Sequence, residues 1–428
     1  MTVTSTPPAR ARPTVLLVMV LVIATTGLIY ELTMAAVASY LLGDSVREFS
    51  LVIGAYLSAL GLGAYLSRYV DSTLARAFID VELGAALCGG LSAPALFLAH
   101  AVSSSFSLVL YVCVALVGIL VGLELPLLMR MLERRVEFKE LVSRALSYDY
   151  AGALLGSLAF SFWLVPKLGL VHGSLACGLL NATVGLVASY ALSEPDTARE
   201  LEKARVRALL VLAILVVALF EAHRVLEFSD HASYPGRVLF ARQSPYQRIV
   251  LSDSNGNLSL HLNGHLQFSS ADEARYHEAL VHPALALGAR HAQVLIGGGG
   301  DGLAARELLK WPDVGSITLV DLDAEVTNLA RSSPELSALN RHALADPRVH
   351  ILNQDALRFL EQSERAFDVE LFDFPDPSNY AVGKLYSTAF YRAARARLSP
   401  GGVMVVQATS PLFARAAFWC VATTLEAV

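Results

Sequence analysis

Four aspartates in the last third of the chain lie where strands of a parallel sheet are expected to end. Asp301 follows four consecutive glycines, Asp321 ends an apolar run, and Asp355 and Asp373 follow two later apolar runs. Because the carboxyl ends of parallel strands lie at one edge of a sheet, we expect these carboxylates to surround one cleft. They would repel one another unless the ligand carried positive charge. The sequence therefore predicts a site for a cationic substrate.

A glycine-rich turn precedes the first of these acids and predicts a nucleotide or nucleoside site. The apolar run at 292–297 leads into the glycines, and a helix is expected to begin near residue 303. Glycine lets the backbone turn sharply and approach a bulky ligand, and the start of a helix offers unpaired N–H groups. An acid roughly twenty residues beyond such a turn commonly holds a ribose, which makes Asp321 the expected partner of the sugar. The loop glycines are Gly298, Gly299, Gly300 and Gly302.

Each acid also has a structural interpretation that involves no ligand. Asp355 has the residue type of a helix N-cap, and Asp321 could be an ordinary loop acid. Asp373 and Asp376 lie among the prolines of 372–377, and such a segment is typical of a turn. A coincidence of all these structural roles at one sheet edge is much less plausible than a binding site.

The elements expected to position these residues form a parallel sheet preceded by a small β region. Apolar runs alternate with helical stretches, which predicts a doubly wound, Rossmann-like α/β domain with a parallel sheet. Upstream, 237–251 and 258–268 alternate apolar and polar residues around an Asn-Gly turn, which predicts a β-hairpin. We expect strands near 292–297, 316–321, 348–353, 367–373 and 402–408, and helices near 303–311, 323–331, 355–362, 387–397 and 411–427.

A helix expected over 270–287 connects the hairpin to the parallel sheet and carries further candidates. Tyr276 and His277 are placed on it as candidate substrate-lining residues. His277 and His282 are separated by five positions and have no partner at metal-ligand spacing. The sequence therefore predicts no metal site.

The first half of the chain has the composition of a membrane protein. The 428 residues are 54% hydrophobic and 17% charged, which is too apolar for a soluble protein of this length. The excess lies before residue 222, where we expect an α-helical membrane bundle of about seven spans. The expected spans lie near 15–42, 49–70, 78–100, 106–129, 148–166, 168–192 and 207–222.

Small residues and acids within these spans suggest how the bundle packs. Closely spaced glycines, such as Gly118 and Gly122, let helices approach one another in lipid. Charge at membrane depth is costly, and Glu31, Glu82 and Glu124 lie within or near spans. These glutamates either lie at the interface or pair inside the bundle, or they line a path for a polyamine or another cation.

The charged residues and cysteines constrain topology and partners. Lysines and arginines gather on the side of the N-terminus, which predicts a cytoplasmic N-terminus. With seven crossings the second domain would then lie outside, unless the short last span does not cross. Only Cys420 of the four cysteines lies outside the expected spans, so cysteine usage gives no support for an oxidising compartment. The net charge of −5 gives no reason to expect nucleic acid as a partner.

Eight short segments of the second half form a recognisable series. They are, in order, 244–249, 262–267, 272–278, 298–302, 321–323, 354–355, 373–377 and 384–387. On these segments, residues 240 to 428 resemble the polyamine aminopropyltransferases, the spermidine synthase family, and the fusion to a membrane bundle resembles its membrane-bound bacterial branch. The resemblance implies a Rossmann-like fold of the methyltransferase type. It also implies transfer of an aminopropyl group from decarboxylated S-adenosylmethionine, a co-substrate, to an amine such as putrescine, with release of methylthioadenosine. No metal or other cofactor is implied, and soluble relatives suggest a homodimer.

The family likeness implies roles for the residues that would hold the donor. Asp321 would bind the ribose hydroxyls, Asp355 the adenine amino group, and Asp301 the ammonium of the aminopropyl group. Gln247 and Gln267 would line the nucleoside and aminopropyl site.

The same likeness implies roles on the acceptor side. Asp373 would be the base that accepts a proton as the amine attacks, and Asp376 and Tyr276 would help to position the acceptor. Asn263 stands where the family often has Asp, and 374–375 replace a small polar pair. Both departures bear on which amine is accepted.

Two alternatives remain beside an aminopropyltransferase. A methyltransferase on the same fold would keep the nucleoside acids without needing both Asp301 and Asp373. A non-enzymatic membrane protein would sense or transport polyamines. We expect a membrane domain at 1–222, a hairpin and connecting helix at 223–290, and the Rossmann-like domain at 291–428. Such a sheet normally continues with two antiparallel strands, so we expect the natural chain to extend beyond Val428. If the donor is a cytoplasmic metabolite, its supply favours a cytoplasmic enzyme domain at the cell membrane.

Overall fold

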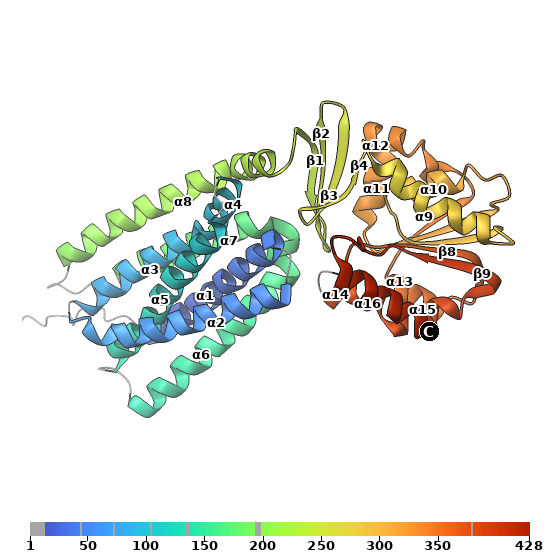
Figure 1. Ribbon diagram of the computed structural model, residues 1–428. Coiled ribbons are helices and arrows are strands. Elements are labelled where there is room, and N and C mark those ends of the chain that lie inside the picture. Colours follow the sequence, from blue (N-terminus) through green and yellow to red (C-terminus); the bar gives the residue numbers. More distant parts are fainter. Residues whose placement is uncertain are drawn as a thin grey trace, which may run out of the picture. The chain divides into compact units, whose positions relative to one another are not determined.

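The computed structural model describes residues 13–42, 45–71, 73–102, 105–133, 137–192, 198–377 and 380–428 (Figure 1). The chain divides into two compact units, residues 1–233 and 234–428. The expected boundary at 222 falls inside the last helix of the first unit, which continues to Ser233. Each unit is described by itself.

The first unit is helical throughout its described length. Its α-helices are α1 (Pro13–Leu42), α2 (Ser45–Leu66), α3 (Leu74–Gly90), α4 (Ser92–Val102), α5 (Phe106–Leu132), α6 (Phe138–Ala159), α7 (Val165–Ala191) and α8 (Ala198–Ser233). A short 3-10 turn, Ser67–Tyr69, follows α2, and a π-helical turn, Phe160–Leu164, joins α6 to α7.

Length and composition of these helices permit five membrane spans among the described residues, or six if the bent pair α3 and α4 forms one. The expected number of seven is therefore not confirmed. One of the five candidates runs over 53 residues, Lys139–Ala191. At 1.5 Å per residue a straight helix of that length would be about 80 Å long, against a hydrocarbon core of about 30 Å. Gly169, at φ 72° and ψ 178°, interrupts its helical geometry.

Glycines bring the helices of the first unit into backbone contact, as their spacing predicts. A Cβ atom on Gly122 would lie 2.3 Å from the Leu60 carbonyl oxygen, and one on Gly63 would lie 2.2 Å from that of Ile119. Gly152 on α6 approaches the Leu21 carbonyl of α1 in the same way. Any larger side chain at these positions would push α2 from α5 or α1 from α6.

The second unit begins with a four-stranded antiparallel sheet in the order β1-β2-β3-β4. Its strands are β1 (Arg237–Gln243), β2 (Arg248–Ser254), β3 (Asn257–Leu262) and β4 (His265–Ser269). The expected single hairpin was incomplete, because each of its two arms contains a further turn. Pro245 cannot donate to a strand ladder and interrupts the first arm, and Asn263-Gly264, both at positive φ, interrupts the second.

A five-stranded parallel sheet follows, in the order β7-β6-β5-β8-β9 (Figure 1). The expected strands are confirmed as β5 (Gln293–Gly298), β6 (Ser316–Asp321), β7 (Val349–Asn353), β8 (Phe367–Asp373) and β9 (Leu398–Val406). The α-helices of this unit are α9 (Glu273–Leu287), α10 (Leu303–Leu308), α11 (Ala324–Ser332), α12 (Pro334–Leu339), α13 (Ala356–Gln362), α14 (Tyr380–Gly383), α15 (Thr388–Arg395) and α16 (Arg415–Glu426). This is a Rossmann-like sheet, as predicted.

Both faces of the parallel sheet are buried, which explains its almost continuously apolar strands. Val294 and Ile296 of β5 face one hydrophobic cluster, while the intervening Leu295 faces the other, because successive side chains point to opposite faces. The chain reverses its direction across the sheet between β5 and β8, which are neighbours in it. Ligands in open α/β sheets bind at such a point, beyond the carboxyl ends of the strands.

Candidate active site

The glycine loop lies at the reversal point and cannot carry side chains. Gly298 and Gly299 have φ angles of 82° and 63°, which L residues with side chains rarely adopt. A Cβ on Gly298 would lie 2.1 Å from the Asp373 carbonyl oxygen of the neighbouring strand. One on Gly300 would lie 2.6 Å from a carboxylate oxygen of Asp321. The loop thus lies directly against two acids of the site, the backbone of Asp373 and the carboxylate of Asp321.

Asp321 is oriented by backbone donors on both sides. Its carboxylate accepts hydrogen bonds from the N–H of Gly300 at 3.0 Å and of Asp323 at 2.9 Å. Burial raises the pKa of Asp321 to about 6, against the opposing effect of these two donors. The result is a fixed carboxylate at the end of β6, next to the glycine loop.

Asp323 links the antiparallel sheet to the end of β6, and the Gln247 side chain donates a hydrogen bond to it. The Asp323 carboxylate accepts from Ser244 Oγ at 2.6 Å and from Gln247 Nε2 at 3.1 Å, and it also caps α11. Gln247 thus contacts the residue two positions after Asp321. Asp323 itself was not among the predicted site residues, although its spacing of two from Asp321 was a usable signal.

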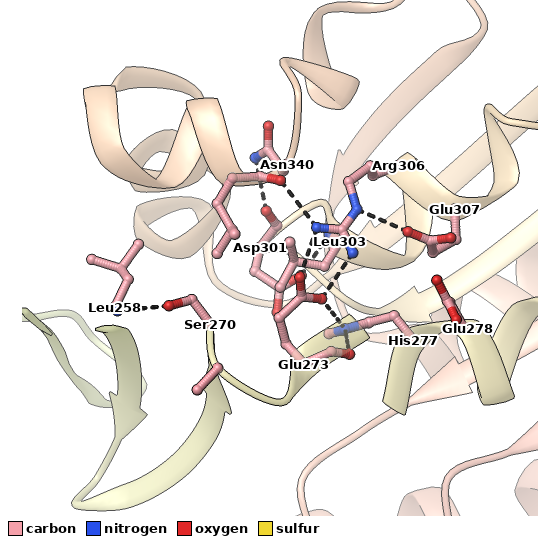
Figure 2. A network of polar contacts seen from close by, with 12 residues as sticks. Leu258, Ser270, Glu273, His277, Glu278, Asp301, Leu303, Arg306, Glu307 and Asn340 are labelled. Atoms are coloured by element: carbon pink, nitrogen blue, oxygen red, sulfur yellow. Dashed lines mark hydrogen bonds and ion pairs between the residues drawn. The ribbon is translucent and has the colours of Figure 1, made fainter. Parts of the chain in front are cut away.

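Asp301 is buried behind the loop. Its carboxylate accepts from the N–H of Leu303 at 2.9 Å, and its backbone carbonyl accepts from Asn340 Nδ2 at 2.9 Å (Figure 2). Burial raises the pKa of Asp301 to about 6; the nearby His277 ring opposes this rise and the Asp373 charge adds to it. Asp301, His277 and Asp373 thus lie close enough to influence one another's ionisation.

His277 belongs to a buried polar chain that the sequence did not reveal (Figure 2). Its Nδ1 lies 2.9 Å from Glu273 Oε2, and Arg306 binds both oxygens of Glu273 at 2.8 Å. Burial disfavours the charged Glu273, but hydrogen bonds from His277 and Arg306 outweigh it and lower its pKa to about 2. Burial also opposes protonation of His277, yet Glu273 and the charges of Asp301 and Asp373 raise its pKa. A protonated His277 places one positive charge among the acids.

Asp373 ends β8 and is bonded to the predicted acceptor-side tyrosine. The Tyr276 hydroxyl donates to Asp373 Oδ1. Burial, and after it the Asp373 charge, raise the pKa of Tyr276, so the phenol stays a donor. One oxygen of the Asp373 carboxylate is thereby fixed at the end of the strand.

Asp376 is held by a residue that sequence reasoning missed. Gln407, which directly follows β9, donates from Nε2 to Asp376 at 2.9 Å and accepts from the Tyr386 hydroxyl at 2.9 Å. Tyr386 also bonds the carbonyls of Phe374 and Pro375, each at 3.1 Å. This network fixes the segment between Asp373 and Asp376.

Asp355 and Gln267 are less integrated. Asp355 caps α13 by accepting from the Arg358 N–H at 3.0 Å, as its structural interpretation predicts, and it also pairs with Lys384 at 2.5 Å. Gln267 on β4 bonds the His265 carbonyl at 3.4 Å. Within the described residues, no hydrogen bond joins Gln267 to the acids.

One further cluster has the composition of a metal site. Ligand atoms of Glu278, His282 and Glu307 lie within 4.8 Å of one another. The His282 Nδ1 accepts from Trp311 Nε1 at 3.1 Å, so the proton of the neutral ring lies on Nε2, which faces Glu307 at 3.1 Å. Lys310 Nζ lies 2.5 Å from Glu307. Donors thus already surround Glu307, and an ion pair network accounts for the cluster.

Comparisons with known proteins show what this chain is similar to. A family model described as "Spermine/spermidine synthase domain" matches residues 273–428. A "Polyamine aminopropyltransferase" of Leptospira interrogans is 44% identical over 415 residues, covering 97% of this chain and 83% of the relative. "Polyamine aminopropyltransferase 2" of Ralstonia nicotianae is 48% identical over 417 residues, covering 96% and 82%. A solved spermidine synthase in complex with the transition state analogue AdoDATO is 29% identical with a TM-score of 0.43, covering 45% of this chain and 65% of that one.

Proposed function

The chain belongs to the polyamine aminopropyltransferase family, and from that premise we propose that its second unit transfers an aminopropyl group from decarboxylated S-adenosylmethionine to putrescine. The products are spermidine and methylthioadenosine. The observation that carries the proposal is the convergence of Asp301, Asp321 and Asp373 around the glycine loop. An ammonium-bearing nucleoside donor and an ammonium acceptor suit such a set of carboxylates.

The reaction requires alignment and one proton transfer. The lone pair of the acceptor nitrogen attacks the aminopropyl carbon that is bonded to sulfur. The C–S bond breaks, its electron pair remains on sulfur, and the sulfonium becomes a neutral thioether. Because the amine arrives as an ammonium, a base must take a proton before or during attack. Asp373, steadied by Tyr276, would be that base. The leaving group is already activated, so catalysis is mainly positioning.

The donor would lie along the glycine loop. Asp321, oriented by two backbone N–H groups, would accept hydrogen bonds from the ribose hydroxyls. Gln247 and Asp323 would lie beside it. Asp301 would attract the donor's ammonium. Asp355 would accept a hydrogen bond from the adenine amino group. Lys384, which pairs with the same carboxylate, would then have to share Asp355 with the adenine or release it.

The acceptor would lie beyond Asp373. Asp376, held by Gln407, offers a second carboxylate for the distal ammonium of a diamine. His277, held by Glu273, would moderate the repulsion between Asp301 and Asp373. A carboxylate-bearing S-adenosylmethionine would meet repulsion from Asp301, which favours the decarboxylated donor over a methyltransferase reaction.

Product analysis tests this reaction. Purified full-length protein with putrescine and decarboxylated S-adenosylmethionine should yield spermidine and methylthioadenosine in equal amounts. With S-adenosylmethionine instead, neither a methylated amine nor S-adenosylhomocysteine should form. Methyl transfer would contradict the proposal, and so would donor binding without any turnover.

We also propose that the first unit anchors the enzyme as a multi-pass protein of the cell membrane. Its candidate spans and its close glycine contacts support this, and the break at Gly169 suggests that α6 and α7 cross separately. Cys420 on α16 is exposed, whereas Cys88, Cys113 and Cys177 lie half-buried or buried in the first unit. Labelling of Cys420 in intact cells by a membrane-impermeant maleimide would place the catalytic unit outside, and labelling only after lysis would place it in the cytoplasm.

A further inference from the structure

The first unit contains a cavity of about 480 Å³ that the aminopropyl transfer does not use. Residues of α1, α2, α5 and α6 line it, and three of them are acids: Glu31, Glu124 and Asp149. Among the described residues the lining includes no lysine, arginine or histidine. Its volume falls in the range of small-molecule sites, which is roughly 300–1,000 Å³.

Glu124, one of the three acids in the cavity wall, has no hydrogen-bond partner among the described residues. Glu124 is 1% exposed, and neither of its carboxyl oxygens has a hydrogen bond within the described structure. The same holds for Glu82, which is fully buried and close enough for its charge to interact with that of Glu124. A buried carboxyl without a partner costs free energy, and membrane acids are by default functional. A ligand that enters the cavity and donates a hydrogen bond to Glu124 would therefore offset this cost.

A second acceptor lies beside Glu124. Pro126 in α5 has no N–H and cannot donate the helical bond to the carbonyl of Gly122. Gly122 and Pro126 both line the cavity. The cavity wall thus combines carboxylates with a backbone carbonyl that does not receive the usual hydrogen bond from four positions ahead in its helix.

The remainder of the lining selects the kind of cation. Aliphatic side chains make up much of it, including Val20, Ile23, Leu28, Leu60 and Leu125. A small inorganic cation needs several converging oxygen ligands, which aliphatic walls do not supply. An alkylammonium ion instead packs its methylene groups against apolar side chains and donates N–H groups to carboxylates.

We propose that this cavity binds an aliphatic amine cation of the diamine or polyamine class, with Glu124 as its main anchor and Glu31 and Asp149 as further acceptors. The site lies in the first unit, so it is a second amine site besides the catalytic one. Binding there does not depend on aminopropyl transfer.

Equilibrium binding of radiolabelled putrescine to full-length protein tests the proposal. Glu124→Gln should weaken one class of binding sites by about thirtyfold or more, because one partner of a buried charge pair is lost. Turnover by the second unit should be unchanged. Glu140→Gln, which removes an exposed acid of the same unit, is the matched control and should bind as the wild type does.

Two further measurements keep the test decisive. Asp149→Asn changes a half-buried residue of the lining and should weaken the same class of sites even if Glu124→Gln fails to fold. Uncharged 1,4-butanediol should not compete with putrescine. Identical isotherms for wild type and both variants would overturn the proposal, as would displacement of the labelled amine from that class by Na⁺ but not by spermidine. Glu124-dependent binding in a protein without turnover would instead overturn the proposed function alone.

Discussion

The strand-end acids of the second unit and two buried glutamates of the first unit differ in their hydrogen bonds. Asp301, Asp321, Asp355 and Asp373 each accept at least one hydrogen bond from the protein. Glu82 and Glu124 of the first unit have none within the described structure. Glu370, in the middle of β8, also has none, so the contrast concerns the strand ends and not every buried acid of the second unit. The comparison indicates that the protein itself orients the strand-end acids, whereas it does not orient Glu82 and Glu124.

The sharpest test of this contrast removes a fully paired acid. Glu273→Gln leaves Arg306 buried without its bidentate partner, and both side chains are under 10% exposed. Breaking one side of a buried ion pair costs about 3–5 kcal/mol. We expect the free energy of unfolding of the second unit to fall by that amount in chemical denaturation. The exposed neighbour Glu278→Gln is the control, and equal stability of the two variants would contradict the pairing.

The reverse change in the first unit should have the opposite sign. Glu82→Met removes a buried carboxyl that has no partner within the described residues. Because an unsatisfied buried polar group costs about 1–3 kcal/mol, the melting temperature of the helical unit should rise. Glu202→Met, at an exposed position of α8, should leave the melting temperature nearly unchanged. A lower melting temperature for Glu82→Met would mean that its carboxyl has a stabilising partner.

The pH dependence of kcat/KM for the donor reports the ionisation of the two acids that would hold it. The pKa values of Asp301 and Asp321 are raised to about 6, so both carboxylates are ionised above that pH and become neutral below it. Only the ionised forms attract the cationic donor. Because both acids must be ionised, we expect kcat/KM for the donor to fall roughly a hundredfold for each pH unit well below 6, about tenfold for each acid. A flat profile of kcat/KM down to about pH 5 would show that the pKa values of these two acids are not raised.

The smallest effect concerns the acceptor side. Gln407→Leu removes the side-chain donor to Asp376 and the acceptor for Tyr386. Loss of one such hydrogen bond is worth about 1 kcal/mol, or roughly fivefold. The KM for putrescine should rise by that factor while the KM for the donor stays constant. A matching rise in the donor KM would mean that Gln407 supports the whole site rather than the acceptor.

Much of the site was predictable because its signals are local. The glycine turn, the strand-end acids and the hydrophobic periods place Asp301, Asp321 and Asp373 without knowledge of tertiary contacts. Gln407 was missed because a single residue type near a strand end is a weak signal, whereas Asp323 lies in the matching segment 321–323 and its spacing from Asp321 could have identified it. The Glu273–Arg306 pair was missed for a different reason: its partners are 33 positions apart, and only the packing of α9 on α10 joins them.

The fold shows the same division. Strands of the parallel sheet were predicted within a few residues because they are continuous apolar runs bounded by turns. The antiparallel region was not, since the turn at Pro245 lies inside a run whose alternation continues on both sides. In the first unit, hydropathy located the helices but not their number of crossings, because a break such as Gly169 changes direction without changing composition.

The proposed reaction depends most directly on Asp373 as the base. The decisive measurement is single-turnover formation of methylthioadenosine and spermidine by wild type and Asp373→Asn, with donor affinity measured in parallel. General-base catalysis contributes about 10²–10⁴-fold, so the rate should fall by that factor while donor affinity changes little. Asn cannot take the proton but keeps the shape of the side chain and can still accept from Tyr276. An unchanged rate, or a loss explained entirely by weaker donor binding, would contradict the proposed mechanism.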